Sequence, residues 1–144
     1  MTSKEVINTE IRLTHADFKK CVRAFMQINF QKQFEKKELD VGVNITHEFD
    51  LVSDNNEIVV KCKSCTWTKN NNLPMASISK LLKELFYFSI VKAKKKILVF
   101  QDHINEKGES LAEVFIEKYN ELLDDIEVWI YDTNNVKVEV LKEK

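Results

Sequence analysis

The stretch HEFDLVSDNNEIVVKCKS, residues 47–64, decides the fold. Apolar residues alternate with polar ones up to Leu51, and residues 53–56 then supply turn-forming side chains. A second apolar run begins at Ile58 and is expected to continue to about Thr66. Two extended segments around a short polar turn predict a β-hairpin.

The hairpin is expected to follow a long helix. Alternation begins at Val41, whereas the residues before it have helical spacing. Thr14 and Asp17 match a helix N-cap, which predicts a helix over 16–37 with lysine-rich last turns. The residues that set its period are Phe18, Cys21, Val22 and Phe25.

Downstream of the hairpin, helices alternate with strands. Ser77 is expected to cap a helix, and the apolar run 97–100 is typical of a strand buried on both faces. Ser110 opens a capping box for a helix to about Leu123. Strands over 126–131 and 136–141 close the chain. The order predicts an α/β fold, a mixed central sheet flanked by helices, in a single domain over 1–144.

Composition restricts the classes of protein. The chain has 44% hydrophobic residues, two Gly and one Pro, which argues against long linkers. No apolar stretch is long enough for a membrane span, and residues 1–5 show no signal-peptide pattern. The three Cys are too few for a secreted domain that is stabilised by disulfides. We therefore expect a cytoplasmic protein without a membrane partner. The net charge of −1 does not indicate a nucleic-acid binder, so any such binding requires a local concentration of lysine.

Strand periodicity also brings charged side chains together. A turn centred near Asn55 places Asp50 opposite about 59–61, and Lys61 and Lys63 are expected on one face, with Cys62 pointing the other way. A carboxylate and two ammonium groups should then cluster. Strict alternation predicts two opposite faces of the first strand, one with Glu48, Asp50 and Val52 and the other with His47, Phe49 and Leu51.

Residues 47–52 and 58–64, with their turn, resemble the active-site hairpin of the PD-(D/E)xK, or restriction-endonuclease-like, nuclease superfamily. The order αβββαβ of that fold also matches residues 15–101, and here a C-terminal helix and β-hairpin would be added. Residues 66–68, the Asn-rich loop and Pro74 look like a bacterial branch with an acid-Cys-Lys motif. The resemblance covers roughly two-thirds of the chain.

The resemblance implies a metal-dependent hydrolase acting on DNA or RNA. Asp50 and the carbonyl of Cys62 would bind Mg²⁺ or Mn²⁺, and Lys63 would orient water or stabilise charge on the phosphate. Lys61, however, stands where the family keeps its second acid. At a dielectric constant of about 20 and a separation of about 4 Å, its repulsion of a divalent ion is twice ~4 kcal/mol. The metal is therefore expected to be weakly bound or absent.

Another acid could compensate for Lys61. Glu84, on the helix after the hairpin, is the first candidate, and Glu48 and Glu57 are weaker ones. For nucleic-acid contact the candidates are Lys61, Lys63, Trp67, Lys69 and Lys80.

Several motifs have simpler interpretations. Cys62 and Cys65 form a CxxC without a second pair, and on a strand their sulfurs face opposite ways. The lysine run 92–96 is typical of a solvated helix end, with phosphate contact as the alternative. The histidines show no ligand spacing, and Trp67 could bury its loop instead of stacking on a base.

Three functions remain open. The chain is a nuclease with impaired or lost activity, a non-catalytic nucleic-acid-binding module, or a protein-interaction subunit, and a homodimer is compatible with each. A lysine patch at the Asp50 end of the sheet would favour the binding module, whereas the net charge near zero favours the interaction subunit.

Overall fold

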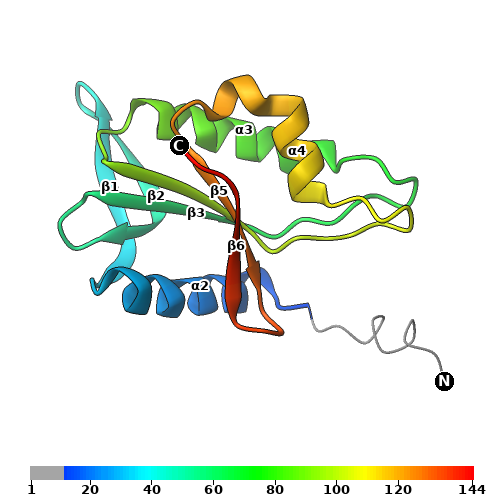
Figure 1. Cartoon of the computed structure of the whole chain (residues 1–144). Coiled ribbons are helices and arrows are strands. Elements are labelled where there is room, and N and C mark those ends of the chain that lie inside the picture. Colours follow the sequence, from blue (N-terminus) through cyan, green and yellow to red (C-terminus); the bar gives the residue numbers. More distant parts are fainter. Residues whose placement is uncertain (1–11) are drawn as a thin grey trace.

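The computed structural model describes residues 12–144, which form a six-stranded mixed sheet with helices on both faces (Figure 1). The predicted α/β class is confirmed; the proposed single domain includes residues 1–11, which lie outside the described residues. Within 12–144, no helix is long and apolar enough to cross a membrane. The strands are β1 (Phe34–Gly42), β2 (Ile45–Ser53), β3 (Ile58–Lys63), β4 (Lys95–Phe100), β5 (Glu127–Asp132) and β6 (Lys137–Lys142), and the helices are α2 (His15–Phe30), α3 (Met75–Ile90), α4 (Leu111–Tyr119) and the 3₁₀ turn η1 (Asn120–Leu123).

The strands lie in the sheet in their chain order. β1, β2 and β3 form an antiparallel meander, β3, β4 and β5 are parallel, and β6 returns antiparallel to β5. The two parallel neighbours need crossover connections, which α3 and α4 supply. The carboxyl ends of β3, β4 and β5 therefore lie at one edge of the sheet.

Each face of the sheet has its own apolar core. α2 packs Phe18, Val22 and Met26 on one face, and α3 and α4 cover the other (Figure 1). β4 contributes to both cores, with Ile97 and Val99 on the α2 side and Leu98 and Phe100 on the α3 side. Its burial on both faces confirms the prediction for the apolar run 97–100.

The predicted first helix, over 16–37, is wrong after residue 30. α2 ends at Phe30, Gln31 caps it in the left-handed conformation (φ 55°), and Lys36 and Lys37 lie on β1. Phe34 is fully buried in the core on the α2 side, and its carbonyl accepts a hydrogen bond from Arg23 Nε at 2.6 Å, so the start of β1 is held against α2. β1 then pairs along most of β2, so tertiary pairing overrides the local helical spacing.

Helix starts follow the predicted caps in two of three cases. Thr14 Oγ1 accepts from the Asp17 amide, and Ser110 Oγ accepts from the Glu113 amide. Ser77 does not cap α3, which begins at Met75 directly after Pro74 without a side-chain cap. The predicted strand to Thr66 also ends earlier, at Lys63.

Strict alternation along β2 fails at Asp50. The register with β1 shifts between Glu35, which pairs with Val52, and Lys37, which pairs with Phe49. One residue of β1 therefore faces two residues of β2, a β-bulge. As a result Phe49 and Val52 pack in the same core. The predicted grouping of Phe49 with Leu51 is wrong, because Leu51 packs on the α2 side.

Candidate functional site

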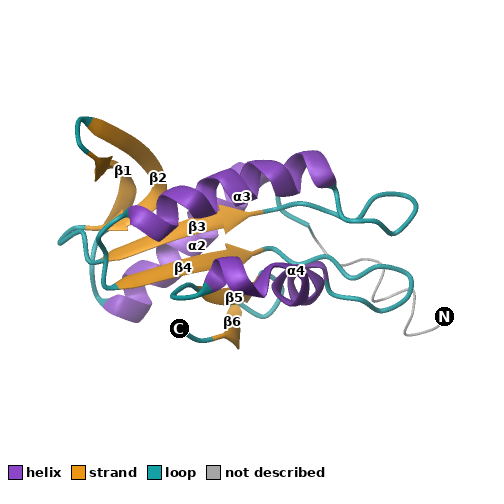
Figure 2. Cartoon of the chain, turned by 90° about the horizontal axis from the view of Figure 1, so that it is seen from above, coloured by secondary structure: helices purple, strands orange, loops and turns teal. Residues whose placement is uncertain are grey.

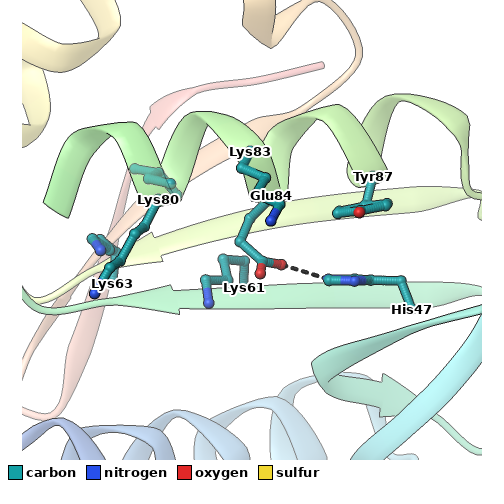
Figure 3. A pocket seen from close by; sticks show the side chains of 8 residues that line it. His47, Lys61, Lys63, Lys80, Lys83, Glu84 and Tyr87 are labelled. Carbon is teal, nitrogen blue, oxygen red and sulfur yellow. Dashed lines mark hydrogen bonds and ion pairs between the residues drawn. The ribbon is translucent and has the colours of Figure 1, made fainter. Parts of the chain in front are cut away.

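Two hollows open between the carboxyl end of β3 and the helix α3, and they share Lys61, Lys63 and Lys80. Their volumes are about 460 and 420 Å³. The first is lined by His47, Lys61, Lys63, Lys80, Leu81, Lys83, Glu84 and Tyr87, most of which are labelled in Figure 3. The second is lined by His15, Lys61, Cys62, Lys63, Ser64, Ala76, Ser77 and Lys80.

Most of the lysines that line these hollows have no acidic partner within the described residues. Within residues 12–144, only Lys61 among them forms an ion pair, with Asp50 at 3.4 Å, whereas Lys63, Lys80 and Lys83 have no acid within 4.0 Å. Three ammonium groups without an acidic partner in the described chain give this hollow a positive potential, which attracts anions.

The pKa of Lys63 reflects both its burial and the neighbouring lysines. Burial lowers the pKa of its ammonium group, and Lys61 and Lys80 lower the pKa further, although Cys65 and Asp50 act in the opposite sense. An anion bound in the hollow would relieve both the repulsion and the cost of burial, and so favour the charged form.

The second hollow also reaches the first turn of α3. Ala76 and Ser77 line it, and this turn contains no acidic residue and no side-chain cap. The free backbone N–H groups and the positive end of the helix dipole add to the charge of the lysines. Partial burial lowers the pKa of His15; Asp50 opposes this effect, and the neighbouring lysines add to it.

Asp50 is held by cations and by the backbone. Its Oδ2 accepts from the Cys62 amide at 3.0 Å and lies 3.4 Å from Lys61 Nζ, while Oδ1 lies 3.9 Å from Lys19 Nζ. The pairing of β2 with β3 stops at Leu51. The Asp50 carboxylate therefore accepts the Cys62 N–H in place of a backbone carbonyl of β2. The structure thus brings Asp50 and Lys61 together, as predicted from a turn centred near Asn55.

These donors do not fit a divalent cation. Asp50 is surrounded by ammonium groups, and within the described chain no three His, Cys, Asp or Glu side chains are grouped to hold a metal. Glu84 binds His47 and does not complete a carboxylate pair, Glu48 lies beside Lys36, and Glu57 pairs with Lys94. The metal role of Asp50, Cys62 and Glu84 stays a prediction.

One end of the first hollow is built from a fixed polar cluster. His47 Nε2 lies 2.7 Å from Glu84 Oε2, and the imidazole stacks on Tyr87 at a centroid distance of 3.9 Å (Figure 3). Sequence reasoning missed Lys83 and Tyr87. The available signal was the stripe Lys80, Lys83, Glu84 and Tyr87, whose spacing places all four on one face of α3.

Two predicted nucleic-acid contacts lie elsewhere. Neither Trp67 nor the exposed Lys69 lines either of these two hollows. Trp67 instead joins the loops after β3 and β4, which extend from the same end of the sheet (Figure 2). Its amide donates to His103 Nδ1, and its indole N–H donates to the carbonyls of His103 and Glu109. Loop packing is therefore the role that the contacts show.

The two cysteines of the CxxC motif, Cys62 and Cys65, are buried on opposite faces of the sheet. Cys62 belongs to the core on the α2 side and Cys65 to the core on the α3 side, so the two sulfurs face opposite ways, as expected. Burial raises the pKa of both thiols. A buried thiol with a raised pKa is a poor nucleophile and a poor metal ligand.

Comparison with known proteins assigns no family. No protein-family model and no curated protein matches the chain. Among solved structures, that of Pyrococcus furiosus SfsA in complex with Ca²⁺ is similar at a TM-score of 0.35 and 17% identity. The match covers 88% of this chain, which spans 60% of that protein. A likeness of this size supports no functional argument.

Proposed function

We propose that the chain is a non-catalytic nucleic-acid-binding module on a nuclease-like fold, and that it holds backbone phosphates in the hollows between β3 and α3. The observation that supports the proposal is that Lys63, Lys80 and Lys83 line the first hollow and have no acidic partner within residues 12–144. Lysine side chains gain little from lying close together, so such a cluster is typical of a site completed by an anion.

The geometry favours binding over cleavage. Phosphodiester hydrolysis of the kind that the PD-(D/E)xK resemblance implies needs a cation held by carboxylates. Here the carboxylate of Asp50 faces Lys61 and Lys19 and accepts the Cys62 amide, so its oxygens already have partners. In this proposal Asp50 positions Lys61, and the chain shares the fold of metal-dependent phosphodiesterases but not their metal site.

The test is a binding titration with matched charge variants. Fluorescence anisotropy with a labelled single-stranded 12-mer, over a salt series, measures the affinity and its salt dependence. We expect Lys63→Gln with Lys80→Gln to weaken binding about a hundredfold and to reduce the slope of log K against log salt by about 2, because two phosphate contacts are lost.

The control removes the same charge from the other end of the sheet. Lys92 and Lys94 are exposed and line neither hollow. The double variant Lys92→Gln with Lys94→Gln is expected to change the affinity less than threefold. An equal loss in both double variants would mean non-specific attraction, and no binding by the wild type would refute the proposal.

A further inference from the structure

The first hollow is not uniformly cationic, because Glu84 lies among its lysines. The carboxylate comes from α3 and points towards β3, between Lys61 and His47 (Figure 3). Its Oε2 is bonded to His47, whereas Oε1 has no hydrogen-bond partner within residues 12–144. The side chain is 27% exposed, so a free acceptor faces the hollow.

Glu84 is held in this position by the packing of its partner. The His47 ring stacks on Tyr87 at an interplanar angle of 10° and meets the edge of Phe49 at 5.0 Å. No lysine nitrogen lies within 4.0 Å of Glu84 in the described chain, although four lysines line the same hollow. The structure therefore maintains an anion beside the cations without neutralising them.

A fixed carboxylate changes which ligand the hollow accepts. It repels a polyanion whose charge continues along the whole hollow, and it attracts a group that donates a hydrogen bond. A ligand that satisfies both parts carries phosphate at one end and N–H or O–H donors at the other. A nucleoside unit has these donors, on the Watson–Crick edge of the base and, in RNA, at the 2′-hydroxyl.

We infer that Glu84 is a specificity-determining residue that accepts a hydrogen bond from a nucleoside of single-stranded nucleic acid, whose phosphates lie on Lys61, Lys63 and Lys80. A single strand is required because base pairing occupies the Watson–Crick donors in a duplex. A hollow of about 460 Å³ matches a group of small-molecule size. This inference rests on the proposed function.

The first test changes only the ligand. A DNA 12-mer is compared with an abasic 12-mer of the same charge, with the corresponding RNA and with the DNA duplex. We expect the wild type to bind base-bearing single strands about tenfold more tightly than the abasic strand and the duplex. Tighter binding of RNA would identify the 2′-hydroxyl as the donor. Equal affinity for all four ligands would overturn the inference.

The second test changes the acceptor. Glu84→Gln keeps an oxygen for His47 and turns the free acceptor into a donor. Affinity for the DNA 12-mer relative to inorganic polyphosphate of similar charge is expected to fall about tenfold, because polyphosphate gains from the lost repulsion. Glu117→Gln, on the exposed side of α4, removes the same charge and should leave the ratio unchanged. Far-ultraviolet circular dichroism checks that both variants fold.

The two proposals fail differently. If wild-type binding depends on Lys63 and Lys80 but Glu84→Gln tightens the 12-mer and polyphosphate equally, the phosphate site stands and the role of Glu84 is wrong. If the wild type binds none of these ligands, the proposed function fails and this inference fails with it.

Discussion

The two ends of β3 and β4 have similar numbers of lysines nearby, but they differ in how many of these lysines are paired with an acid. At the amino end, three successive lysines each pair with an acid: Lys94 with Glu57 at 2.5 Å, Lys95 with Glu127 at 2.6 Å and Lys96 with Asp125 at 3.3 Å. At the carboxyl end, Lys63, Lys80 and Lys83 have no such partner within the described chain.

The comparison shows that lysine density in the sequence does not locate the lysines that lack an acidic partner. The run 92–96 is the densest basic segment, yet its paired members are neutralised locally and offer little net field to a phosphate. The cationic hollow is assembled from lysines of a strand and of a helix that follows it. The net charge of −1 therefore does not argue against an anion site.

Charge reversal at the carboxyl end should have the largest effect. Lys61→Glu is expected to weaken binding of the single-stranded 12-mer more than a hundredfold, because an attraction becomes a repulsion. The same change also places a second carboxylate beside Asp50, so we expect Mg²⁺ or Mn²⁺ binding that the wild type shows weakly or not at all. Calorimetric titration of both proteins measures the metal affinity.

Two further observations would decide whether this end of the sheet descends from a nuclease site. Mg²⁺-dependent cleavage by Lys61→Glu that a further Lys63→Ala removes would support that ancestry, with EDTA as the control. Tight metal binding by the wild type would contradict the expectation, and Glu84→Ala should then abolish it if Glu84 is the compensating acid.

The paired end should instead matter for stability. Glu127 accepts from Lys95 Nζ at 2.6 Å and from Trp129 Nε1 at 3.1 Å, and its side chain is 11% exposed. Glu127→Ala leaves an indole N–H buried without an acceptor, so we expect the free energy of unfolding to fall by about 2 kcal/mol. Lys63→Gln, which breaks no ion pair among residues 12–144, should lower the free energy of unfolding by less than about 0.5 kcal/mol. Urea denaturation of both variants compares the two ends; equal losses would remove the distinction.

The smallest expected effect is a pH dependence of binding through His15. The pKa of His15 is lowered in the free protein, chiefly by partial burial, and a phosphate in the second hollow would raise it. Binding then takes up a proton, so affinity should rise about twofold to threefold as the pH falls from the higher, bound-state pKa towards the lower, free-state one. A 12-mer without terminal phosphate avoids titration of the ligand.

His15→Gln should flatten this profile, and an unchanged profile would place the phosphate away from His15. The same shift affects folding with a definite sign. Because the folded-state pKa lies below the unfolded value, the unfolded chain binds more protons between the two, and stability decreases as the pH falls through that window.

Local signals in the sequence determined several parts of the fold. Ser110 caps its helix as expected, since the Glu113 amide that its hydroxyl accepts from is three residues away. The turn before Ile58 forms where Asn56 adopts a positive φ of 60°, a conformation that Asn tolerates. The strand over 97–100 is buried on both faces, as its continuous apolar run predicts. Each feature depends on neighbours within a few residues.

The site was decided by contacts that join distant segments. Neither the end of α2 nor the bulge at Asp50 is visible in local periodicity, because both depend on pairing between β1 and β2. His47 and Glu84 are 37 residues apart, and Lys95 and Glu127 are 32 apart. Sequence could place Asp50 near Lys61 across one short turn. Which lysines are neutralised depends on which acids the sheet and helices bring within about 4 Å, and only the tertiary structure determines that distance.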